Sequence, residues 1–184
     1  NQSHEMAIYT LDASYIMDDY SGPNSDSKVT GFYEGIRSDA FNLGLKGSPI
    51  SIKNTEFDKN EISIHLSNMQ FPRIISNQLL IGKKETPDLG VGFCYYSLGS
   101  YLDHVSNFVY CDNSHTKLYN PSSDPSCTFQ YTTGLEIHNS GENDQDVSRN
   151  SFELLRHGID CDMKCADKFG NKGINFGCNV NKGN

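Results

Sequence analysis

Short segments in which apolar and polar residues alternate recur along the chain, each about as long as a β-strand. The clearest covers residues 62–66, where isoleucine or leucine alternates with Ser63 and His65. This period of two is typical of a strand that buries one face. Similar segments occupy residues 7–11, 29–33, 41–45, 50–52, 74–75, 79–81, 91–96, 108–111, 127–132 and 135–138. The pattern predicts a protein made mostly of β-strands.

Turn-forming stretches rich in Gly, Pro, Asn, Asp and Ser separate these segments, at 21–26, 46–49, 120–125 and 139–144. Regularly spaced short strands with such turns favour an antiparallel β-sandwich or a barrel-like domain. The strand signals continue across residue 94, and no internal repeat is evident. We therefore expect one β-rich domain over residues 1–184.

One short helix is predicted near Ser151–His157. Asn150 can cap it, and Glu153 stands three positions later, as in a capping box. An apolar stripe follows, and Gly158 is a suitable C-terminal stop.

All six cysteines lie in the second half, so residues 1–93 have none and residues 94–184 hold Cys94, Cys111, Cys127, Cys161, Cys165 and Cys178. An even number of widely spaced cysteines favours three disulfides. Cys94 and Cys111 form the first expected pair, at the ends of a hairpin, and one further bond would tie the tail to Cys127. The alternative is a zinc site made by Cys161, Cys165 and Cys178 with His157.

Disulfides persist where the surroundings are oxidising, so the chain is expected to be secreted or periplasmic. Its formal net charge is −8 and it has no basic block, which argues against a nucleic-acid partner. No apolar run reaches the ~20 residues that span a bilayer.

The chain opens without a signal peptide, so we interpret it as a mature exported form. Its single glycosylation sequon, at Asn1, favours a bacterial source.

The sequence offers candidates for two kinds of chemical site, a catalytic site and a Ca²⁺ site. No Gly-x-Ser-x-Gly or His-Glu-x-x-His motif is present, so we expect a binding protein rather than an enzyme. His138 and Glu136, close together at the end of a strand-like segment, are the residues that a secreted hydrolase or toxin would use. No cofactor is expected, although the acidic residues within 12–26 and 142–146 supply oxygen atoms of the kind that bind Ca²⁺.

Tyrosines are concentrated in one stretch and are interleaved with polar residues. A tyrosine offers an apolar ring and a hydroxyl, which suits sugar and protein surfaces, although alternate tyrosines also pack within sheets. The predicted binding residues are Tyr95, Tyr96, Tyr101, Asn113, His115 and Tyr119.

The sequence thus favours an exported bacterial recognition protein, such as an adhesin, colonisation factor or virulence-associated binding module. It would contact a host glycan or a partner protein, with a surface appendage or pilus as a further possible partner. The alternatives are the secreted hydrolase or toxin and a structural subunit of a surface polymer, which would add a strand to its neighbour.

Overall fold

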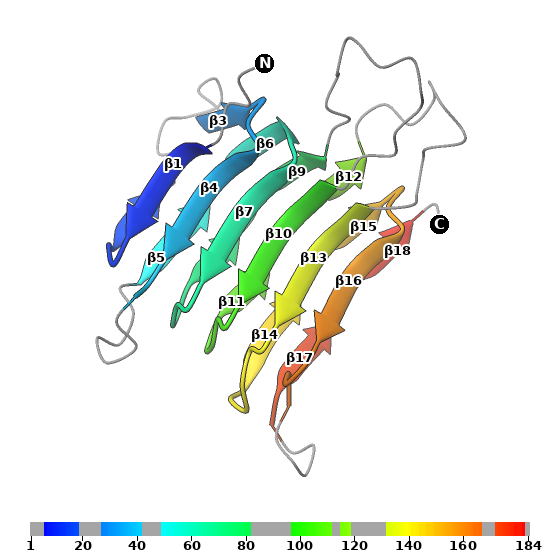
Figure 1. Cartoon of the computed structure of the whole chain (residues 1–184). Helices are drawn as coiled ribbons and strands as arrows, with labels where there is room; N and C mark the ends of the chain where they lie inside the picture. Colours follow the sequence, from blue (N-terminus) through cyan, green and yellow to red (C-terminus); the bar gives the residue numbers. More distant parts are fainter. Residues whose placement is uncertain are drawn as a thin grey trace.

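The chain folds as a parallel β-helix. The computed structural model describes residues 6–18, 27–41, 49–81, 97–111, 115–118, 132–166 and 172–182. These residues form 18 strands and no helix. The strands make three six-stranded sheets in which every third strand of the chain is a neighbour (Figure 1). Each of six coils therefore contributes one strand to each sheet.

Sheet A is the face drawn in front in Figure 1. It consists of β1 (Met6–Leu11), β4 (Glu34–Asp39), β7 (Ile62–Ser67), β10 (Ser97–Asp103), β13 (Thr132–His138) and β16 (His157–Asp162). All five neighbouring pairs are parallel and in register. Equivalent residues of successive coils therefore stack in straight rows across the sheet.

Sheets B and C complete each coil. Sheet B consists of β2 (Tyr15–Met17), β5 (Ile50–Lys53), β8 (Arg73–Ile75), β11 (Val109–Cys111), β14 (Gln145–Ser148) and β17 (Ile174–Gly177). Sheet C consists of β3 (Ser27–Thr30), β6 (Thr55–Asn60), β9 (Gln78–Ile81), β12 (His115–Leu118), β15 (Ser151–Glu153) and β18 (Val180–Lys182).

Single residues in the left-handed conformation turn the chain from one sheet to the next. Such residues follow five strands of sheet A, with φ between 49° and 63°: Asp12, Asn68, His104, Asn139 and Met163. Others link sheet B to sheet C: Asn54, Ser76, Arg149 and Cys178. A left-handed residue changes the chain direction sharply within one position. The coil can therefore close without a hairpin.

The core is built from stacks of apolar side chains. Sheet C contributes Val29, Phe57, Leu79 and Phe152, which occupy one row and are all buried. Rows of isoleucine, leucine and valine from sheets A and B face them. Neighbouring strands lie ~4.8 Å apart, so each side chain contacts its equivalents in the coils above and below. Burying each large apolar side chain stabilises the fold by about 1.5–3 kcal/mol.

Buried asparagines satisfy the backbone where sheets meet. Asn77 donates from Nδ2 to the carbonyl of Ile52 at 3.0 Å and accepts from the amide of Thr55 at 3.1 Å. Asn60 makes the same kind of bridge with Val29 and Phe32. Buried backbone groups at corners need such partners, because no ladder hydrogen bond reaches them.

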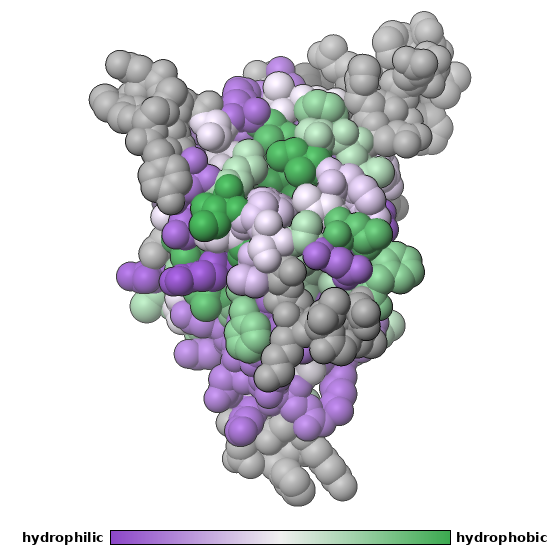
Figure 2. Space-filling view, turned by 90° about the vertical axis from the view of Figure 1, so that its left-hand side faces the viewer, coloured by the Kyte–Doolittle hydropathy of each residue, from purple (hydrophilic) through white to green (hydrophobic). Residues whose placement is uncertain are grey.

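Apolar side chains also reach the surface of the first coil. Met6, Tyr9, Leu11 and Ile16 are exposed there. Figure 2 shows apolar patches between polar ones on this end of the solenoid. None of the described residues belongs to a helix that could cross a membrane.

The antiparallel sandwich or barrel predicted from the sequence is wrong. The alternation of apolar and polar residues located many strand positions, but it carries no information about which strands pair with each other. The repeat was missed because its period varies. The equivalent positions Ile8, Ile36, Ile64, Ser100, Leu135 and Ile159 are separated by 28, 28, 36, 35 and 24 residues. Coils of unequal length hide the periodicity.

The predicted helix near Ser151–His157 is also wrong. Residues 151–153 form β15, and Gly158 lies inside β16 instead of ending a helix. Leu154 between them has a φ of 59°, which is incompatible with a right-handed helix. Asn150 caps nothing; its buried amide donates to the carbonyl of Tyr110 and to Oδ1 of Asn179 in the next coil.

The expected disulfide-stapled second half is contradicted as well. No disulfide joins any two of the described cysteines, and Cys161, Cys165 and Cys178 carry free thiols. Cys111 is buried in β11, and the preceding strand β10 belongs to another sheet, so the described residues between Cys94 and Cys111 do not form the expected hairpin. Cys94 and Cys127 lie outside the described residues. The described cysteines therefore give the prediction of export no support.

Candidate functional site

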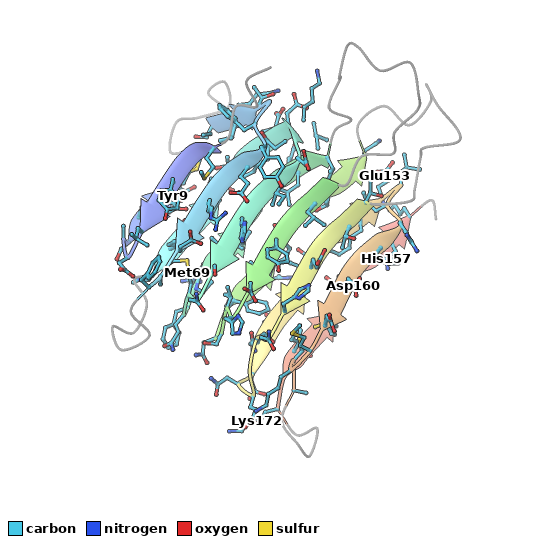
Figure 3. The ribbon with its side chains drawn as sticks, in the orientation of Figure 1. Tyr9, Met69, Glu153, His157, Asp160 and Lys172 are labelled. Carbon is cyan, nitrogen blue, oxygen red and sulfur yellow. The ribbon has the colours of Figure 1, made fainter. Side chains whose placement is uncertain are left out.

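The outer face of sheet A carries two in-register rows of polar and aromatic side chains. The first, here called the central row, is Tyr9, Arg37, His65, Tyr101, Glu136 and Asp160. The second, the end row, holds the last residue of each strand: Leu11, Asp39, Ser67, Asp103, His138 and Asp162. Figure 3 shows Tyr9 and Asp160 at opposite ends of the central row.

Strand alternation explains why these side chains face outward. Ile36, Ile64 and Leu135 precede members of the central row and are fully buried. Successive side chains of a strand point to opposite faces, so the apolar residues enter the core and their neighbours face solvent. The same apolar stacks that hold the coils together thus align the outer rows.

Four charged or polar side chains interact in the part of the face formed by β4 and β7. Three of them are on β4 and one is on β7. Nδ1 of His65 donates to Oε1 of Glu34 at 2.8 Å. Arg37 Nη1 lies 3.5 Å from the other carboxylate oxygen of Glu34, and its Nε donates to Oδ2 of Asp39 at 2.9 Å. The Glu34 side chain is only 5% exposed. Each group therefore restricts its neighbour to one orientation.

These contacts set the charge state of Glu34. Burial alone would raise the pKa of Glu34, but the hydrogen bond and charge of His65, together with Arg37, outweigh it and lower the pKa below its ordinary 4.5. Ionised Glu34 consequently stabilises the fold above about pH 4.5. This contribution is lost as the pH falls through the lowered folded-state pKa.

We predict that Glu34→Gln destabilises the protein at pH 7 by about 1–2 kcal/mol, because His65 and Arg37 lose a charged partner. The deficit relative to wild type should shrink at an acidic pH that lies below the lowered pKa of Glu34, where the wild-type carboxylate becomes protonated. Urea unfolding at both pH values measures this. Glu142→Gln, on an exposed carboxylate paired with Lys164, is the matched control and should show no comparable pH-dependent deficit. A Glu34→Gln deficit that is equal at both pH values would contradict this account.

Tyr101 stands at the centre of the face between two imidazoles. The ring of His65 meets it edge-on, with centroids 4.9 Å apart and an interplanar angle of 84°. His138 lies on its other side at 5.2 Å, tilted by 56°. His138 Nε2 in turn donates to Oε1 of Glu136 at 2.8 Å. The result is a continuous band of rings across β7, β10 and β13.

The face is acidic around this band. The two rows and Glu34 together contain six carboxylates, on Glu34, Asp39, Asp103, Glu136, Asp160 and Asp162, and one guanidinium, on Arg37. Burial raises the pKa of Tyr101, and the negative charges of Asp103 and Glu136 add to the effect. Its hydroxyl therefore stays protonated and can donate a hydrogen bond at neutral pH.

Of the six predicted binding residues, the structure places Tyr101 in this face. His115 belongs to β12 of sheet C, so it is not a neighbour of Tyr101 on the same sheet. Tyr95, Tyr96, Asn113 and Tyr119 lie outside the described residues. The other candidate pair, His138 and Glu136, is brought into direct hydrogen-bond contact.

The sequence reasoning missed Tyr9, Arg37 and His65. Their only common signal is the spacing of 28 residues between successive members, each next to an isoleucine that enters the core. Two equal intervals followed by unequal ones of 36, 35 and 24 residues do not stand out in a single sequence.

The predicted metal sites do not assemble. Among the described residues, no group of three or more His, Cys, Asp or Glu side chains is placed to hold a metal ion. The zinc set of His157, Cys161, Cys165 and Cys178 is therefore not formed. In the acidic stretches proposed for Ca²⁺, Asp12 accepts from the amide of Phe41. Carboxylates in the second stretch likewise bond within the protein.

Comparison with known proteins gives no relative for this chain. No family model, curated protein or solved structure matches it.

Proposed function

We propose that the outer face of sheet A binds an extended glycan that is uncharged or carries amino groups. This proposal rests on the position of the Tyr101 ring, which lies between His65 and His138 in the middle of the central row. An aromatic ring offers a stacking surface, and the carboxylates around it accept hydrogen bonds from sugar hydroxyls.

The layout of the face supports a long ligand. The central row crosses six strands at ~4.8 Å intervals instead of gathering around one point. A linear polymer lying along the row would meet a polar or aromatic group at each strand. The excess of carboxylates disfavours polyuronates and other anionic chains, because like charges repel.

In this proposal the protein is an exported bacterial recognition protein, of the adhesin or colonisation-factor kind, and its partner is a host glycan. The chain is acidic, and its sequence contains no basic block that would suit nucleic acid.

Isothermal titration with three linear hexasaccharides tests the proposal. We expect the glucosamine hexamer and cellohexaose to bind and the galacturonate hexamer not to bind. Binding of the glucosamine hexamer should weaken with added salt, since exposed charges are screened. Preference for galacturonate, or no binding to any of the three, would refute it.

A hydrolase is the second candidate, favoured by one observation. Glu136 and Asp160 are in register on adjacent strands, so their Cα atoms lie about 4.8 Å apart. Retaining glycosidases act through a pair of neighbouring carboxyl groups, about 5–5.5 Å apart. Mass spectrometry of hexamers incubated with the protein would reveal shortened products. Loss of those products in Glu136→Gln would assign the reaction to this pair.

A further inference from the structure

Three sulfur-bearing side chains converge beside the last described coil. A pocket of about 760 Å³ is lined by residues that include Cys161, Met163, Cys165 and Lys172. Lys172 is labelled at this end of the molecule in Figure 3. The pocket lies apart from Tyr101 and its neighbours, so the glycan proposal makes no use of it.

The turn after β16 brings the two thiols together. Cys161 is in β16, and Met163, with a φ of 63°, reverses the chain so that Cys165 returns toward it. The thiols of Cys161 and Cys165 are hydrogen-bonded to each other. The Cys165 thiol also donates to the carbonyl of Asp162 at 3.2 Å. Both thiols thus lie in the wall of one pocket.

Met163 adds a third sulfur atom. Its side chain is 68% exposed although it is large and apolar. Nδ2 of Asn139 donates to its Sδ at 3.0 Å, and Met163 lines the same pocket as the two cysteines. Thiols and thioethers are soft ligands, which prefer soft cations such as Cu(I) to Mg²⁺ or Ca²⁺.

We propose that Cys161 and Cys165, assisted by Met163, form a binding site for Cu(I). Two thiolates satisfy this ion in a linear arrangement, and the thioether supplies a third, weaker ligand. The described residues provide no third His, Cys, Asp or Glu ligand, which disfavours a four-coordinate zinc site.

Binding releases two protons: one Cu⁺ and two thiols give a bis-thiolate complex of charge −1 and two H⁺. No electron is transferred. The pKa of Cys161 is raised, mainly by shielding from water and then by the hydrogen bond to Cys165. Because the ligating thiols must lose their protons, binding should tighten as the pH rises.

Anaerobic titration of the full chain with Cu(I), in competition with the chelator bicinchoninate, tests the site. We expect one tightly bound Cu(I) per chain, lost in Cys161→Ser and in Cys165→Ser. Met163→Leu should weaken binding several-fold, because one weak ligand is removed. Cys178→Ser, which removes an exposed thiol outside the pocket, is the matched control and should leave binding unchanged.

Tight Cu(I) binding that survives both Cys161→Ser and Cys165→Ser would overturn the proposal, as would the absence of tight binding in wild type. Circular dichroism of each variant checks that the β-helix is intact. Because these variants leave Tyr101, His65 and His138 unchanged, failure here is distinguishable from failure of glycan binding.

Discussion

Gly134→Ala is expected to destabilise the protein by about 3 kcal/mol, near the upper end for overpacking a core. A methyl group at this position would lie 2.3 Å from Cδ1 of the buried Phe152 ring and 2.6 Å from the carbonyl oxygen of Gly158. Neither neighbour can move freely, since one is a stacked core ring and the other is the backbone of the next coil. In a chain of this size the loss corresponds to a melting temperature lower by roughly 6–12 °C.

Gly177→Ala is the matched control for this substitution. Gly177 also lies in a strand, but a methyl group there would meet its nearest neighbour, Cβ of Ser148, at an ordinary 3.5 Å. Its melting temperature should stay close to that of wild type. Scanning calorimetry of both variants makes the comparison. Equal melting temperatures for the two variants would show that successive coils do not approach each other at Gly134 as described.

Tyr101→Ala is expected to weaken binding of the glucosamine hexamer by about 10–30-fold, the effect typical of a central aromatic residue in a recognition surface. The substitution removes the ring between His65 and His138 and leaves both imidazoles without their aromatic contact. Tyr101→Phe keeps the ring and loses only the hydroxyl, so its loss should be several-fold smaller. Titration calorimetry of the three proteins measures the difference.

Phe176→Ala is the control for Tyr101→Ala, because it also removes an aromatic side chain but from another sheet. Phe176 is 51% exposed in β17 of sheet B and should leave glycan affinity unchanged. If Tyr101→Ala and Phe176→Ala bind the hexamer equally well, the ring of Tyr101 is not part of the binding surface. Matching melting curves for both variants would exclude unfolding as the cause of any loss.

The sequence revealed strands but not their assembly. The alternation around Ile64 follows from burial of one strand face, which is a local property, and the structure confirms that strand as β7. Which strand pairs with which depends on contacts between residues 24 to 36 positions apart. The left-handed turn at Leu154 could not be predicted from the sequence either, because leucine rarely adopts that conformation.

Only some residues of the candidate site could be predicted from the sequence. His138 and Glu136 share one strand, two positions apart, so their closeness could be inferred locally. Tyr101 was selected for its residue type, without its neighbours. His65 reaches Tyr101 only because β7 and β10 are in register across a long intervening segment. Such a contact requires the coil arrangement, which no single segment encodes.

The outer face of sheet A is the proposed glycan-binding surface. The most direct test is a titration of ¹⁵N-labelled protein with the glucosamine hexamer, followed by backbone amide chemical shifts. We expect the largest shift changes in β7, β10 and β13, around Tyr101, with little change in β8, β11 and β14 of the same coils. Changes concentrated in sheet B or C, or no change at saturating hexamer, would contradict it.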